Sequence, residues 1–144
     1  MSDNNAWHYA GKHGANAVVD SVVRNAVLKR APKGELPCAV AFEVAKELRV
    51  LPDAVGRAAD LLELRLVKCQ LGLFGYRPQK SIVKPAVSVS QGLEEAILEG
   101  LINDRLPCKT AWDIAEQLRI QRMRISGACD TLGIKIKPCQ LGAF

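Results

Sequence analysis

Four of the five cysteines form two matched pairs that could bind a metal ion or respond to redox state. Cys38 and Cys108 each follow a Leu-Pro dipeptide, whereas Cys69 and Cys139 each precede Gln-Leu-Gly. A thiol at the start of a helix has a lowered pKa and is more reactive. However, the chain has no Cys-x-x-Cys motif, and structural zinc usually takes four ligands. We therefore predict that these thiols and Cys129 are small core residues, with metal or redox sensing as the alternative.

The two histidines, His8 and His13, lie close to the N-terminus beside Trp7 and Tyr9. They could bind a metal ion, but the segment is more typical of a polar tail. General acid–base catalysis most often uses histidine, and this chain has none elsewhere. It also lacks a glycine-rich phosphate loop and a Ser–His–Asp set. The sequence therefore predicts a protein that is not an enzyme and that needs no cofactor or metal.

An internal repeat with an offset of 70 residues organises the chain. Leu36-Pro37-Cys38 corresponds to Leu106-Pro107-Cys108 without a gap. The match continues through Leu48-Arg49-Val50 with Leu118-Arg119-Ile120, and through Cys69-Gln70-Leu71-Gly72 with Cys139-Gln140-Leu141-Gly142. A single offset that holds over so many positions indicates duplication, so the sequence predicts two similar small domains.

Each repeat has the pattern helix, short strand, helix, turn, helix, hairpin. Apolar positions at helical spacing predict first helices over residues 17–29 and 91–103. Alternating segments at 64–67 and 134–137 predict the hairpins. A Pro-, Ser- and Lys-containing stretch between the repeats predicts a basic linker. The expected organisation is a tail over 1–16, unit 1 over 17–76, a linker over 77–90 and unit 2 over 91–144.

The middle of each repeat has the spacing of a helix–turn–helix. In the second repeat Ile114 and Leu118 are expected to face the core, Ala115 to lie at a helix crossing, and Ile120 to plug the turn. The chain thereby resembles the winged helix–turn–helix superfamily of DNA-binding regulators. The resemblance implies a mostly α fold with small β-hairpins, as two tandem winged domains, each with a DNA-reading helix and a wing. Arg49 and Arg119 depart from it, because many members have glycine there.

Basic side chains at the start of the last helix predict that the second unit contacts DNA. The predicted DNA-binding residues are Arg119, Gln121, Arg122 and Arg124 at this helix, Lys135 and Lys137 in the wing, and Arg57 in the first unit. From residue 106 to 144 there are six Lys and Arg against three Asp and Glu, whereas residues 36–76 have five of each. The first unit also has Asp53 at the equivalent helix start, and its carboxylate would repel phosphate.

The predicted function is therefore a transcription regulator that binds double-stranded DNA, with unit 1 assisting or forming homodimer or protein contacts. The net charge of +5 agrees with an anionic partner. Two alternatives remain: a protein-interaction adaptor built from tandem winged helices, and an RNA-binding module. No apolar run approaches the roughly 20 residues of a membrane helix, and no apolar signal core precedes residue 15. We expect no membrane partner and a cytoplasmic location.

Overall fold

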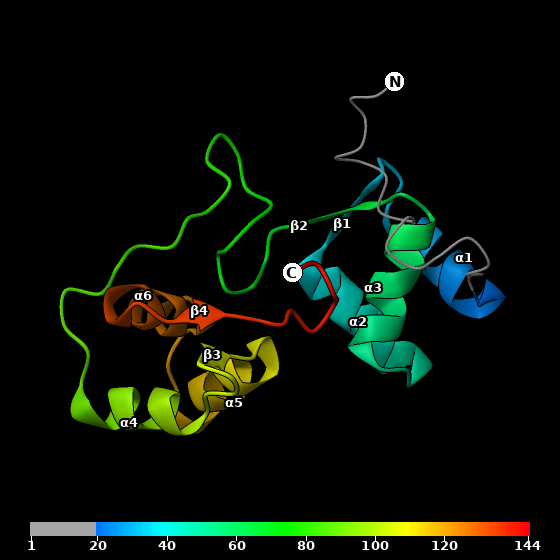
Figure 1. Cartoon of the computed structure of the whole chain (residues 1–144). Helices are drawn as coiled ribbons and strands as arrows, with labels where there is room; N and C mark the ends of the chain where they lie inside the picture. The colour runs from blue at the N-terminus through cyan, green and yellow to red at the C-terminus, as the bar shows by residue number, and fades with distance from the viewer. Residues whose placement is uncertain (1–19) are drawn as a thin grey trace. The chain divides into compact units, whose positions relative to one another are not determined.

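The computed structural model describes residues 20–144, which form a mostly α-helical chain with short strands (Figure 1). The chain divides into two compact units. Unit 1 comprises the described residues up to Cys69 together with Leu141–Ala143, and unit 2 comprises Gln70–Gln140 together with Phe144. The division differs from the expected one, because residues 70–90 belong to unit 2 and a short C-terminal segment belongs to unit 1.

Unit 1, within the described residues, contains three helices and a pair of strands. The elements are α1 (Ser21–Arg30), β1 (Glu35–Pro37), α2 (Cys38–Leu48), α3 (Pro52–Leu61) and β2 (Arg65–Val67). The Asp20 carboxylate caps α1 by accepting from the backbone N–H groups of Val22 and Val23, which satisfies two of the amides that a helix start leaves unpaired. The part of the predicted first helix that precedes residue 20 lies outside the described residues.

Unit 2 repeats this order. Its elements are α4 (Gln91–Glu99), β3 (Arg105–Leu106), α5 (Cys108–Leu118), α6 (Arg122–Leu132) and β4 (Lys135–Ile136). Helix α4 ends at Glu99, four residues before the predicted end, with Gly100 as its C-cap. The residues that follow form a tight turn in which Asn103 and Asp104 have positive φ angles and Ile102 is bridged to Arg105. Consequently Ile102, which falls inside the predicted helix, lies outside α4 and is 60% exposed.

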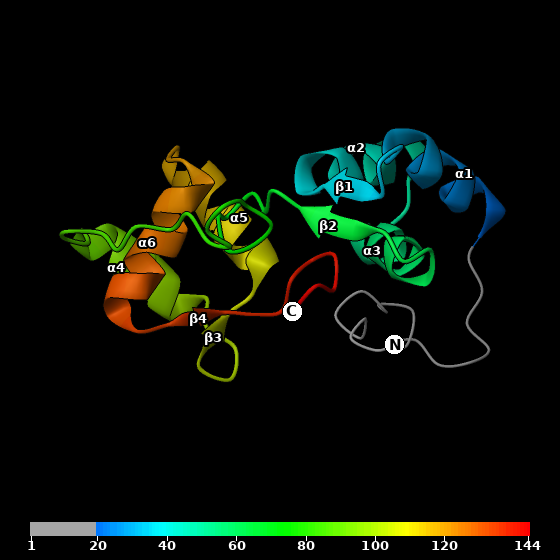
Figure 2. The ribbon, with the colours of Figure 1, turned by 90° about the horizontal axis from the view of Figure 1, so that it is seen from above.

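The predicted hairpins are wrong for the part of the chain that the structure describes. Strand β2 pairs in parallel with β1, with Leu36 opposite Leu66, and β4 pairs in parallel with β3, with Leu106 opposite Ile136 (Figure 2). The physical reason is the connection, since two helices separate the strands of each pair and return the second strand in the same direction. Each unit therefore has a parallel strand pair where a winged domain would have its hairpin.

The helix–turn–helix spacing predicts the helices of both units correctly. Arg49 and Arg119 are the C-caps of helices α2 and α5, and both are left-handed, with φ 56° in each. The backbone N–H of Ile120 then donates to the Ala115 carbonyl, which closes the turn as in a Schellman motif. Ala45 and Ala115, which are predicted to lie at a helix crossing, are both buried. Leu118, expected to face the core, is 40% exposed because it is the last residue before the turn.

Candidate nucleic-acid interface

The start of α6 and the turn before it form an open hollow of about 690 Å³ within unit 2. Of the predicted DNA-binding residues, Arg119, Gln121 and Arg122 line this hollow, together with Trp112 and Glu116 of α5. Arg119 and Gln121 are exposed. The left-handed turn at Arg119 lets α6 start beside α5, so that side chains separated along the sequence lie around one opening. The structure therefore brings together three of the predicted residues.

Arg122 is held by contacts inside unit 2. Its guanidinium carbon lies 3.7 Å from the centroid of the Trp112 ring, and its Nη1 donates to Gln70 Oε1 at 3.1 Å. A guanidinium stacked on an indole gains about 0.5–2 kcal/mol, depending on its exposure. Arg122 is correspondingly half-buried. The sequence did not reveal this role, because Gln70 is 52 residues away.

Residues 71–86 cover the face of α6 that points away from α5. The Ser126 hydroxyl donates to the Leu71 carbonyl at 2.6 Å, and the Thr131 hydroxyl donates to the Ala86 carbonyl at 2.7 Å. The Ala86 amide in turn donates to the Gly127 carbonyl at 3.0 Å. In a helix–turn–helix protein this face reads bases. In this chain residues 125–129 of α6 are buried, whereas Met123 and Arg124 near its start and Asp130 and Thr131 near its end are exposed.

Gly127 is the residue that lets the chain approach α6 so closely. A Cβ atom added there would lie 2.6 Å from the carbonyl oxygen of Lys84. The stretch 77–90, expected to be a linker, therefore contains residues packed against a helix. A glycine inside a helical pattern often marks such an approach, and this was the one signal of it in the sequence.

Arg124 lies on the exposed side of α6 and lines a second hollow of about 490 Å³. Gln121 lines both hollows, and Lys84 contributes a further exposed basic side chain to the second one. Sequence reasoning missed Lys84 because it lies in the stretch predicted to be a linker. Together, Arg119, Arg124 and Lys84 form what we call the α6 basic edge.

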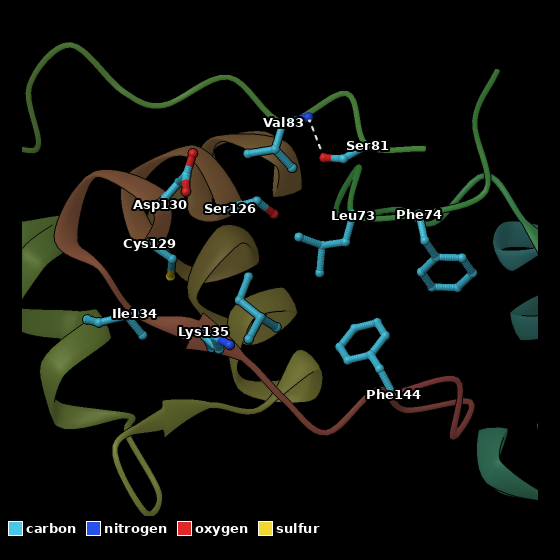
Figure 3. A pocket seen from close by; sticks show the side chains of 11 residues that line it. Leu73, Phe74, Ser81, Val83, Ser126, Cys129, Asp130, Ile134, Lys135 and Phe144 are labelled. Carbon is cyan, nitrogen blue, oxygen red and sulfur yellow. Dashed lines mark hydrogen bonds between the residues drawn. The ribbon is translucent and has the colours of Figure 1, made fainter. Parts of the chain in front are cut away.

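Lys135 and Lys137, the predicted wing residues, are exposed but lie beyond the opposite end of α6. An α-helix rises 1.5 Å per residue, so the 11 residues of α6 separate them from the start of the helix by about 15 Å. Lys135 lines a different cavity of about 510 Å³ with Cys129 and Asp130 of α6 (Figure 3). The rings of Phe74 and Phe144, which meet edge to face at 5.8 Å, border the same cavity.

The first unit offers fewer basic groups at the equivalent positions. Arg57 is exposed on α3, but Pro52 begins this helix and Asp53 lies in its first turn. Leu51 is 73% exposed before the helix, whereas Val55, whose exposure would have favoured the adaptor alternative, is fully buried. Position for position, unit 1 lacks the counterparts of Arg122 and Arg124.

The five cysteines differ in their exposure to solvent. Cys38, Cys69, Cys108 and Cys129 are buried, and Cys139 is partly exposed. Burial raises the pKa of the Cys129 thiol to about 11, so that it stays protonated at neutral pH. In residues 20–144, no three His, Cys, Asp or Glu side chains are grouped in a way that could hold a metal ion. His8 and His13 lie outside the described residues.

Comparison of the chain with protein-family models, curated proteins and solved structures gives no match. The winged helix–turn–helix resemblance therefore stays a prediction. None of the described helices is long and apolar enough to cross a membrane.

Proposed function

We propose that this protein is a DNA-binding regulator that contacts the phosphate backbone through the α6 basic edge. The observation that carries the proposal is the exposure of Arg119 and Arg124 at a helix start, with Lys84 close to Arg124. The side chain of the N-cap residue Gln121 accepts no hydrogen bond from the backbone amides in the first turn of α6. The backbone amides at a helix start attract phosphate, and adjacent guanidinium groups add to that attraction.

The proposed contact is mainly with phosphates rather than with bases. The outer face of α6 is occupied at Ser126, Gly127 and Thr131, so these residues do not reach base edges in this arrangement. Phosphate contacts supply affinity and orientation, whereas base contacts supply specificity. We therefore expect weak sequence preference and strong salt dependence.

Duplex affinity measured at several salt concentrations tests the proposal. Three phosphate contacts predict a slope of log affinity against log salt of about −2.7, at about −0.9 for each contact. Arg119→Ala, Arg124→Ala and Lys84→Ala should each weaken binding to all duplexes and reduce the slope by about 0.9. Arg49→Ala and Arg57→Ala in unit 1 are matched controls and should leave the slope unchanged.

Arg122→Ala separates a structural role from a binding role. Because Arg122 stacks on Trp112, its loss should lower thermal stability and change tryptophan fluorescence while altering the salt slope less than Arg124→Ala does. If the wild type binds duplex without salt dependence, or if Arg57→Ala weakens binding most, the α6 basic edge is not the interface. Single-stranded DNA and RNA run in parallel distinguish the RNA-binding alternative.

The adaptor alternative is favoured by a separate observation. The outer face of α6 binds an extended backbone through the hydroxyls of Ser126 and Thr131. The adaptor alternative therefore requires a partner segment that displaces residues 71–86 from this face. If none of the nucleic acids binds, the adaptor hypothesis replaces the regulator hypothesis.

A further inference from the structure

The repeated Leu-Gly pair that follows Cys-Gln has no part in the proposed nucleic-acid contact. We call residues 71–72 and 141–142 the Leu-Gly segments. Leu71 and Leu141 are among the most buried side chains of the described chain, at 0% and 1% exposure. Each segment follows the last strand of one repeat, yet each belongs to the compact unit formed by the other repeat. Leu71 lies in unit 2 and Leu141 in unit 1.

The two segments reach equivalent positions in their units. In unit 2 the Leu71 carbonyl accepts a hydrogen bond of 2.6 Å from Ser126 on α6. In unit 1 the Leu141 carbonyl lies against Gly56 on α3. Gly56 and Ser126 are 70 residues apart, and so are Leu71 and Leu141, so the repeat offset relates both partners of each contact.

The contacts themselves differ in their chemistry. A Cβ atom on residue 56 would lie 1.8 Å from the Leu141 oxygen, so that carbonyl fits only against a glycine. In unit 2 the serine at the same position donates a hydrogen bond to the carbonyl. A buried carbonyl is stabilised by a hydrogen-bond donor, and the hydroxyl of Ser126 supplies one there.

From this arrangement we infer that the Leu-Gly segments are docking segments, each of which completes the unit of the other repeat, and that residues 56 and 126 hold the docked segments in place. Glycine at residue 56 leaves room for the Leu141 carbonyl against α3. The Ser126 hydroxyl holds the Leu71 carbonyl against α6 by a hydrogen bond. Neither repeat is complete by itself, which explains why Leu-Gly recurs after both strand pairs.

Hydrogen–deuterium exchange of the 144-residue chain, followed peptide by peptide, tests the inference. Leu141→Ala should speed exchange in α3 by about tenfold or more and leave α6 unchanged, because a helix opens more often once the leucine packed in its unit is truncated. Leu71→Ala should do the reverse. Either variant acting on the helix of its own repeat, or on both helices equally, would overturn the docking assignment.

The role of residue 56 needs its own pair of variants. Gly56→Ser should speed exchange in α3 and in the peptide over 139–144, since the added Cβ displaces the Leu141 carbonyl. Gly92→Ser is the matched control, because a Cβ at this helical position meets nothing within 4 Å. Ser126→Ala should speed exchange over 70–75 but not over 139–144. Equal exchange in Gly56→Ser and Gly92→Ser would show that residue 56 does not hold the Leu141 segment in place. If Gly56→Ser does not fold, the two leucine variants decide.

Discussion

Replacing the arginine at each helix–turn–helix turn with glycine should stabilise both units but weaken nucleic-acid binding in only one. Arg49 and Arg119 have φ 56°, with ψ 42° and 47°. Such left-handed conformations cost an L-residue of this kind about 1–2 kcal/mol, whereas glycine adopts them freely. Glycine also gives the unfolded chain more freedom, which removes about 0.4–1 kcal/mol of the gain.

The net expectation is about 0.5–1 kcal/mol of added stability at each site. In a unit of this size 1 kcal/mol shifts the melting temperature by about 4–8 °C, so each variant should gain about 2–8 °C. Both arginines are exposed, so their replacement removes little packing. The two gains should add in the double variant, because the residues belong to different units.

The assay is thermal and denaturant unfolding of both variants, followed by duplex affinity at several salt concentrations. Arg119→Gly should reduce the salt slope by about 0.9, because one phosphate contact is removed. Arg49→Gly should leave the slope unchanged. The reasoning about the turn fails if either variant is less stable than the wild type. The assignment of Arg119 to the interface fails if the two variants bind alike.

Two further predictions concern the buried side of α6. Burial raises the pKa of Cys129 from 9.0 to about 11, so folding favours the protonated thiol. Relative to Cys129→Ala, the wild type should therefore lose about 2–3 kcal/mol of unfolding free energy as the pH rises from 9 through 11. Denaturant unfolding at several pH values measures this loss, and parallel pH profiles of the two proteins would contradict it. Gly127→Ala should lower stability by about 1–3 kcal/mol and speed exchange over 82–88, because its Cβ would meet the Lys84 carbonyl. Gly92→Ala is the control, because a Cβ at residue 92 meets nothing within 4 Å, and it should gain up to about 1 kcal/mol of stability. Similar stability changes in the two alanine variants would show that Lys84 does not pack against Gly127.

The Leu-Gly segments and the chain around Leu71 also show which contacts a local sequence pattern cannot predict. Periodicity reveals which side of α6 is apolar, but the chain that covers its outer side comes from residues 71–86. That stretch contains two prolines and two lysines, a composition typical of a linker as well as of an extended chain that lies against a helix. The glycines at 56 and 127 were the only local signs of close approach, and their partners could not be inferred from spacing alone.

The sequence by itself determined the duplication, the mostly α composition, the starts of α2 and α5 at Cys38 and Cys108, and the turns at Arg49 and Arg119. These features depend on residues a few positions apart, because apolar periodicity and the signals that start and stop a helix are local. Only the tertiary structure decided the parallel pairing of the strands, the stacking of Arg122 on Trp112, and the unit to which each Leu-Gly segment belongs. Most of these choices depend on backbone and side-chain groups that find their partners 30 or more residues away, and a single sequence carries no local record of those partners.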